Sequence, residues 1–348
     1  MYTLLLATKG QIKEKRHKPI IVRKMPIEIL EIKNFKSIKH LKLQCRRVNL
    51  FIGEPNTGKS NILEAIGLLS HLGHGRINDF VRFEVMNDLF YDRVLDDPIR
   101  VGFNEKALEI AFKDGQFNGT LITQLDETKK TSSHVFRYGY DGGREKPLKA
   151  FQEFKYYQFR KRLIFSRQMS EFLNPPHADN LLAVILGRKE LRTVFKNLFG
   201  KFGYRPVFKP QEGKIEILKE LEDILIGIPY SLTSETLQRI VFFLAAIYSN
   251  KESILTFEEP EAHAFPYYTK YLAERIALDK NNNQYFIATH NPYLLMSILE
   301  KSLEEEVTIF VTSMEKYQTK AKALTVKQKE EILGMGMDIF FNIEKFLS

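Results

Sequence analysis

The chain has 348 residues, of which 44% are hydrophobic and 27% are charged, which is the composition of an ordinary globular protein. Its single cysteine, Cys45, excludes a disulfide framework and any all-cysteine metal site, and it fits a reducing, cytoplasmic compartment. The apolar run at residues 4–7 is far shorter than the roughly 20 residues that a membrane span needs. Basic residues follow this run instead of preceding it, so we expect neither a membrane span nor a secretory signal.

The formal net charge of +9 is concentrated at the start of the chain. Residues 1–24 hold seven lysines and arginines against one acid, Glu14, so this arm carries +6 and the remaining residues only +3. Such an arm is expected to contact phosphate backbones or an acidic partner. The alternative is a solvated, disordered leader.

Three strands and one helix are predicted in the first quarter of the chain. Apolar and charged residues nearly alternate over residues 26–33 and again over 41–45, which is typical of half-buried strands. Residues 48–52 form a short, largely apolar run of the kind found in buried strands. A helix is predicted from about residue 59 to 72, with an apolar face formed by Ile62, Leu63, Ile66 and Leu69.

The segment between that buried strand and that helix fits the phosphate-binding pattern G-x-x-x-x-G-K-[ST]. In such a loop the glycines let the backbone N–H groups face phosphates, and the helix adds the positive end of its dipole. Lys59 is expected to reach the β- and γ-phosphates of ATP, and the Ser60 hydroxyl to bind Mg²⁺. The predicted ATP-binding residues are Gly53, Glu54, Pro55, Asn56, Thr57, Gly58, Lys59, Ser60 and Asn61.

The middle of the chain, about residues 75–225, is predicted to be an inserted region of mixed structure. It contains one helical stretch, from about residue 178 to 202, and strand-like pieces at 107–112, 134–140, 154–159 and 214–219. The chain has no internal repeat and no sustained heptads, so we expect no long coiled coil.

The last third returns to a regular alternation of helices and strands. A helix over 235–249 precedes an apolar strand over 253–257, a helix follows Pro266, and a second apolar strand covers 284–289. Both strands end in polar side chains, which indicates an α/β sheet with its site at the carboxyl ends of the strands.

Three polar residues at these strand ends are the candidate catalytic and metal-binding residues. Glu258 and Glu259 are adjacent, and two adjacent acids are costly to ionise unless a metal or phosphate site compensates their charge. Glu258 is expected to hold the magnesium ion, and Glu259 to act as general base on the attacking water. His290 is placed to reach the γ-phosphate, whereas His263 is expected in a structural turn.

The chain resembles ATP-binding-cassette (ABC) ATPases of the chromosome-maintenance and overcoming-lysogenization-defect type. The resemblance is carried, in order, by the phosphate loop, by Glu258-Glu259-Pro260-Glu261-Ala262-His263 and by Ala288-Thr289-His290-Asn291-Pro292. Residues 29–38 are also similar to the first strand of those proteins and its aromatic turn. The resemblance implies an α/β P-loop NTPase of ABC-ATPase head type over residues 25–348, with a mixed central sheet, helices and the inserted region.

In this family two heads enclose two ATP molecules, so the resemblance implies an ATP-dependent homodimer. The signature loop, which faces the phosphate loop of the other head, is matched here by Thr233, Ser234 and Glu235. Glu235 replaces the usual glycine, so we expect its carboxylate to turn aside or to weaken the dimer. Glu258 stands where the family usually has aspartate. The glutamine that senses magnesium in the family is matched only by Gln152 or Gln158.

The expected activity is hydrolysis of ATP with Mg²⁺. Nuclease-bearing members carry a further acidic domain after the switch histidine, and the residues after His290 are too few for one. Two roles are left open: a DNA-associated motor or clamp in repair, chromosome handling or defence against mobile elements, and a nucleotide-dependent switch acting on a partner such as a toxin or nuclease. A P-loop kinase is the alternative enzyme, and a membrane-transport subunit is disfavoured by the degenerate signature.

Overall fold

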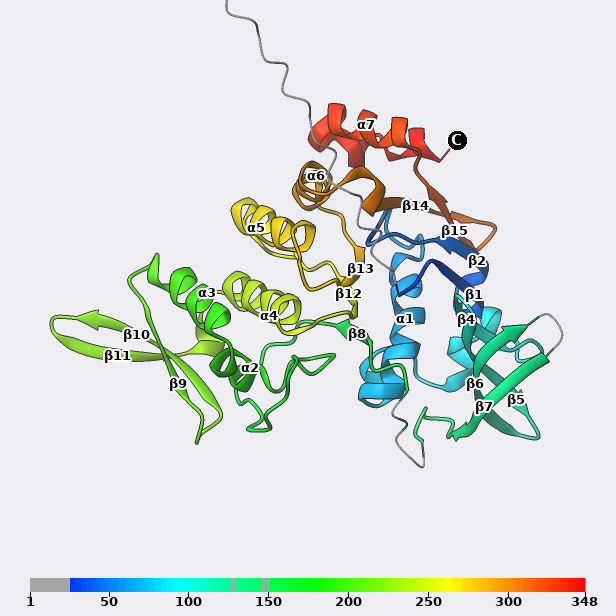
Figure 1. Ribbon diagram of the computed structural model, residues 1–348, viewed down its shortest axis with the longest axis horizontal. Coiled ribbons are helices and arrows are strands. Elements are labelled where there is room, and N and C mark those ends of the chain that lie inside the picture. The colour runs from blue at the N-terminus through cyan, green and yellow to red at the C-terminus, as the bar shows by residue number, and fades with distance from the viewer. Residues whose placement is uncertain (1–25, 127–128, 145–147, 149, 348) are drawn as a thin grey trace, which may run out of the picture.

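The computed structural model describes residues 26–347 with the exception of 127–128, 145–147 and 149. The predicted basic arm, residues 1–24, lies outside the described residues. The described chain forms three sheets and the helices that pack on them (Figure 1). None of the helices in this part is long and apolar enough to cross a membrane.

The central sheet contains the strands that precede the predicted motifs. Its strand order is β15-β14-β3-β13-β12-β8, and all described neighbours are parallel except the pair β14 and β15. The bounds are β3 Val48–Gly53, β8 Phe154–Tyr157, β12 Ile254–Glu258, β13 Gln284–Ala288, β14 Val307–Glu315 and β15 Gln318–Ala323. The predicted fold class, an α/β head with a mixed central sheet, is confirmed.

Helices and a second sheet bury both faces of the central sheet. The helices are α1 Lys59–His74, α4 Glu235–Ser249, α5 Pro266–Ala277, α6 Pro292–Lys301 and α7 Val326–Met335. Val48, Leu50 and Ile52 of β3 belong to the core shared with α4, α5 and α6, whereas Phe51 belongs to the core shared with α1. A strand buried on both faces is nearly all apolar, which explains why β3 was predictable.

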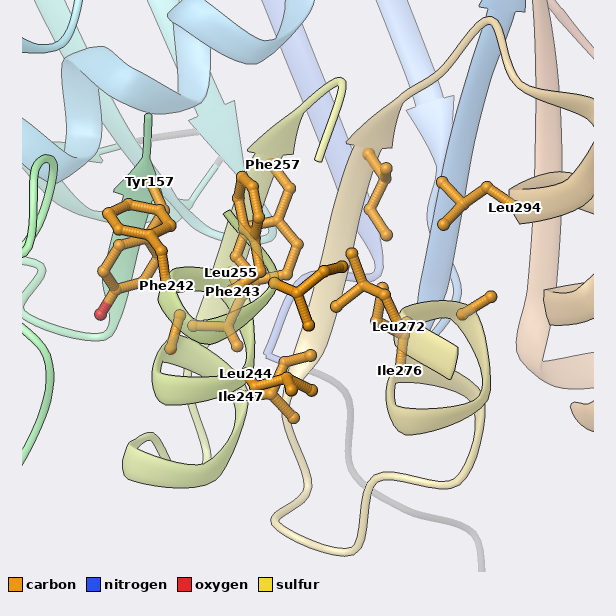
Figure 2. Close-up of a cluster of buried hydrophobic side chains, with 14 of the residues drawn as sticks. Tyr157, Phe242, Phe243, Leu244, Ile247, Leu255, Phe257, Leu272, Ile276 and Leu294 are labelled. Atoms are coloured by element: carbon orange, nitrogen blue, oxygen red, sulfur yellow. The ribbon is translucent and has the colours of Figure 1, made fainter. Parts of the chain in front are cut away.

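The core between β12 and its helices is built largely from aromatic side chains. Figure 2 shows Phe257 of β12 near Phe243 of α4, and their ring centroids lie 5.0 Å apart. Phe257 is fully buried and also contacts Tyr157 of β8 and Tyr285 of β13. This packing fixes the strand whose carboxyl end carries Glu258.

A six-stranded antiparallel sheet covers the α1 side of the molecule. Its order is β2-β1-β4-β5-β6-β7, with bounds β1 Ile29–Phe35, β2 Ile38–Gln44, β4 Ile99–Phe103, β5 Lys106–Lys113, β6 Gln116–Asp126 and β7 Lys129–Tyr138. The predicted strands at 26–33, 41–45, 107–112 and 134–140 correspond to β1, β2, β5 and β7. The sequence did not predict that β1 pairs with β4, because the two strands lie far apart along the chain.

A smaller lobe carries the rest of the middle region (Figure 1). It contains helices α2 Leu181–Gly187 and α3 Lys189–Gly200 and an antiparallel sheet of β9 Arg205–Lys209, β10 Lys214–Leu221 and β11 Ile224–Pro229. The prediction of a single helical stretch from 178 to 202 is therefore wrong, because two helices cover this range. Arg188 has an extended backbone (φ −127°, ψ 118°) and separates two helices.

Candidate functional site

The three predicted motifs meet at one edge of the central sheet. Strands β3, β13 and β12 are adjacent and parallel, and Ala288 pairs with Phe51 on one side and with Glu258 on the other. The phosphate loop, the two acids and His290 therefore all follow the carboxyl ends of neighbouring strands. This is the position at which open α/β sheets bind ligands.

The phosphate loop has a backbone that only glycine accommodates at two positions. Gly53 has φ +153° and Gly58 has φ +91°. A Cβ atom on Gly58 would lie 1.9 Å from Oγ1 of Thr319, and one on Gly53 would lie 2.3 Å from Oγ1 of Thr312. The loop is also braced from within, because the Thr57 hydroxyl donates to the Glu54 carbonyl (2.8 Å). The curled loop is thus held against the β14–β15 hairpin, and α1 begins directly after it.

Lys59 lies inside this loop and is only 6% exposed. Its Nζ donates to the carbonyl oxygens of Gly53 (2.8 Å) and Glu54 (2.6 Å). Burial lowers the pKa of Lys59 to about 8, although the carboxylates of Glu259, Glu258 and Glu54 act in the opposite direction. An ammonium group held in this way is ready to interact with an anion.

Glu258 lies at the end of β12 among polar groups from several elements. Its Oε2 accepts a hydrogen bond from the hydroxyl of Tyr156 on β8 (2.9 Å). Lys36, in the turn after β1, and Arg82 both form ion pairs with the buried Glu64 of α1. Burial lowers the pKa of Lys36, whereas that of Arg82 is raised against the effect of burial, mainly by Glu64, and Glu258 acts upward on both. Sequence reasoning missed these partners because they come from separate segments.

Glu259 and His290 lie side by side. His290 Nε2 is 3.5 Å from Glu259 Oε1, and their side chains are 38% and 48% exposed. Burial and the charge of Lys59 lower the pKa of His290, against the opposing effect of Glu259. The imidazole is therefore mainly neutral at pH 7. Glu259 has φ +42°, a left-handed conformation that rarely occurs outside glycine and is found at functional sites.

The signature segment lies at the start of α4. The Thr233 hydroxyl donates to the Tyr230 carbonyl (2.7 Å), and Ser234 is the residue that precedes the helix. The Glu235 carboxylate accepts from Nε of Arg239 one turn along the helix (2.9 Å), and this hydrogen bond lowers the pKa of Glu235. The carboxylate is therefore turned along α4 toward a cation.

The two candidate glutamines lie at opposite ends of β8. Gln158 directly follows β8, whose carboxyl end lies beside that of β12, whereas Gln152 precedes β8 at the opposite end of the strand. The carbonyl of Gln152 accepts a hydrogen bond from His74 at the end of α1. His263 has φ +59° in the turn after the acids, and the described residues contain no metal-binding group of three or more His, Cys, Asp or Glu side chains.

The chain is similar to known proteins both in sequence and in fold. The AAA ATPase domain family matches residues 25–165. The DNA replication and repair protein RecF of Caldanaerobacter subterraneus subsp. tengcongensis is 34% identical to this chain over an alignment of 115 residues. The alignment covers 31% of this chain and 29% of that protein. The chain therefore matches less than a third of the length of RecF, and the activity of whole RecF is not assigned to it here.

Two solved structures share the fold over most of the chain. An Smc head bound to the C-terminal winged-helix domain of ScpA has a TM-score of 0.51 at 18% identity, covering 87% of this chain and 99% of that one. An Smc head with an extended coiled coil, bound to the C-terminal domain of ScpA from Pyrococcus furiosus, has a TM-score of 0.50 at 17% identity, covering 88% and 98%. The fold is thus that of SMC head P-loop ATPase domains. Together these findings support an ABC-type ATPase of the SMC and RecF kind.

Proposed function

We propose that this protein binds and hydrolyses ATP with Mg²⁺ at the carboxyl edge of β3, β12 and β13. The observation that carries the proposal is the convergence of Lys59, Glu259 and His290 on one edge, with Glu259 and His290 only 3.5 Å apart. The backbone of residues 53–61 binds the phosphates, and Lys59 exchanges its two loop carbonyls for the β- and γ-phosphates.

The residues around Glu258 fit a magnesium ion. Mg²⁺ prefers carboxylate and hydroxyl oxygens, which Glu258 and Ser60 supply, and it usually reaches the protein through one or two carboxylates plus substrate phosphates. The nearby Lys36 and Arg82 are paired with Glu64, which leaves the other oxygen of Glu258 for the ion. When bound, the ion neutralises charge that develops on the transferred phosphoryl group. Gln158 is the glutamine that we assign to this edge.

Glu259 acts in this proposal as general base. It accepts a proton from the water that attacks the γ-phosphorus, and its half-exposed position leaves room for that water. The neutral imidazole of His290 can donate a hydrogen bond to the γ-phosphate while it stays beside Glu259. Both residues act in the same step, so replacing either should slow hydrolysis more than it weakens binding.

A second copy of the chain is proposed to complete the site. Thr233 and Ser234, at the positive end of the α4 dipole, would face the γ-phosphate held by the other copy. Glu235 does not oppose this contact strongly, because Arg239 already pairs with its carboxylate. ATP binding would bring the two heads together, and hydrolysis would release them.

Phosphate release from Mg-ATP, measured against protein concentration, tests this proposal. A specific rate that rises steeply with concentration is expected if two heads form each site. A flat, nonzero rate would mean a self-sufficient site or a preformed dimer, and no turnover at any concentration would point to a switch that awaits its partner. A phosphorylated acceptor in place of free phosphate would indicate a kinase.

The proposed setting is the cytoplasm, in DNA repair, chromosome handling or defence against mobile elements. The likeness to a DNA replication and repair protein and the basic arm of residues 1–24 support it. Binding to duplex DNA that weakens with salt and is lost on deleting residues 1–24 is the expected result. Unchanged binding without the arm would contradict its role. The alternative is a nucleotide-dependent switch on an effector protein, which needs no DNA.

A further inference from the structure

A third carboxylate, Glu261, lies buried behind the proposed catalytic pair. Glu261 is only 4% exposed, and its Oε1 accepts a short hydrogen bond from the hydroxyl of Thr289. The Thr289 hydroxyl in turn accepts from the backbone N–H of Asn291 (3.0 Å). The backbone N–H of His290 lies close enough to the Glu261 carboxyl to lower its pKa slightly, against the larger effect of burial. One side chain from the acidic loop therefore holds the whole turn that carries His290.

The other oxygen of this carboxyl group, Oε2, is buried and has no partner among the described residues. A buried, ionised carboxylate with one bare oxygen is costly, and a proton on that oxygen removes the charge and most of the cost. Burial raises the pKa of Glu261 to about 7, and the neighbouring Glu259 adds to the rise. The charged or titratable groups beside it are Glu259 on its own loop and His290 on the turn after β13. The neutral carboxyl form suffices for the hydrogen bond with Thr289.

The loop that contains Glu261 is held at two further points. The N–H of Glu259 donates to the Ala288 carbonyl (2.9 Å), and the carbonyl of His263 accepts from the Thr236 hydroxyl on α4 (2.8 Å). Glu259 and His263 both have positive φ values, so the loop needs such bonds to keep its shape. Of these three attachments, only Glu261 uses a side chain to reach the histidine turn.

We propose that Glu261 is a positioning residue, which fixes Glu259 opposite His290 by tying the acidic loop to the turn at Thr289. This inference rests on the proposed function for its catalytic consequence. The position of Glu259 beside His290 can be tested without ATP turnover. If the tie is lost, Glu259 moves away from His290, and the electrostatic effect of Glu259 on that imidazole is lost with it.

The titration of His290, followed by NMR in the full-length protein, tests the geometry. His290→Gln identifies its signal among the eight histidines. Glu259→Gln should lower the pKa of His290, because Glu259 raises that pKa in the native protein. Glu261→Ala and Thr289→Val should lower the pKa of His290 to the value found in Glu259→Gln. Glu261→Gln and Thr289→Ser keep the hydrogen bond between residues 261 and 289 and should leave the pKa of His290 unchanged. A native pKa of His290 in folded Glu261→Ala or Thr289→Val protein would overturn the proposal.

Steady-state kinetics of the same variants test the consequence for catalysis. Glu261→Ala should lower kcat about tenfold or more with little change in KM, as expected when a reacting group is misplaced. Glu261→Gln should restore most of the rate. A fall in melting temperature with native kcat would mean that Glu261 is only structural and would overturn the proposal. No ATP turnover by the native protein would refute the proposed function instead, and the His290 titration would still decide the role of Glu261.

Discussion

Lys59 is expected to take up a proton when ATP binds at alkaline pH. In the free protein, burial lowers its pKa from 10.5 to about 8, which corresponds to roughly 3 kcal/mol against the charged form. A bound triphosphate places negative charge beside Nζ and favours the ammonium form, so the pKa returns toward its usual range. Because about 0.9 of the free lysine is neutral at pH 9, binding should take up close to one proton there and about 0.1 at pH 7.

Calorimetric titration of ATP in two buffers of different ionisation enthalpy measures this uptake. Lys155 serves as an internal control because burial also lowers its pKa to about 8, yet it bonds to Asn250 and Ser253 away from the phosphate loop. Lys155→Met should therefore leave the uptake unchanged. Uptake below about 0.2 proton at pH 9, with ATP still bound, would refute the buried, depressed state of Lys59.

The same shift predicts how the stability of the free protein depends on pH. Between about pH 8 and 10.5 the unfolded chain holds the Lys59 proton and the folded chain does not. The contribution of Lys59 to the free energy of unfolding therefore rises with pH across this range. Urea unfolding of the native protein and of Lys59→Met isolates this contribution: the free energy of unfolding of the native protein minus that of the variant should rise with pH. A constant difference would contradict the shift.

Three further predictions concern the loop, the core and the signature. Gly58→Ala should abolish ATP binding by fluorescence titration, because its Cβ would lie 1.9 Å from Thr319 Oγ1 at a strained φ; native affinity would contradict the loop geometry. Phe257→Ala should lower the free energy of unfolding by about 3–5 kcal/mol in urea, while Leu225→Ala on the exposed β11 should change it by less than about 0.5 kcal/mol. Glu235→Gly should shift the protein concentration for half-maximal turnover less than about threefold, since Arg239 already pairs with Glu235; a tenfold shift would mean that the carboxylate faces the nucleotide.

The sequence predicted the parts of the fold that local pattern determines. The helices at α1 and α4 begin where the sequence places them, and β3, β12 and β13 are largely apolar because both faces of their sheet are buried. The antiparallel sheet was not predicted as a unit, because its pairing of β1 with β4 is non-local. The smaller lobe was predicted only in part, since one helical stretch was expected where Arg188 separates α2 from α3.

The candidate site was likewise predicted from the sequence only in part. The phosphate loop and the acids follow from motifs that are contiguous in the chain, as does His290. The partners of Glu258 do not, because Tyr156 and Arg82 reach it from segments that carry no motif of their own. Glu261 was visible in the sequence as part of the acidic run, but its burial behind Thr289 is a property of the folded turn.

Glu259 is proposed to activate the water that hydrolyses ATP. Single-turnover hydrolysis of radiolabelled Mg-ATP by the native protein and by Glu259→Gln, with ATP affinity measured in parallel, tests it most directly. The variant should bind ATP with native affinity and hydrolyse it at least ~100-fold more slowly, a plausible loss for a general base. Hydrolysis at the native rate by Glu259→Gln would contradict the account.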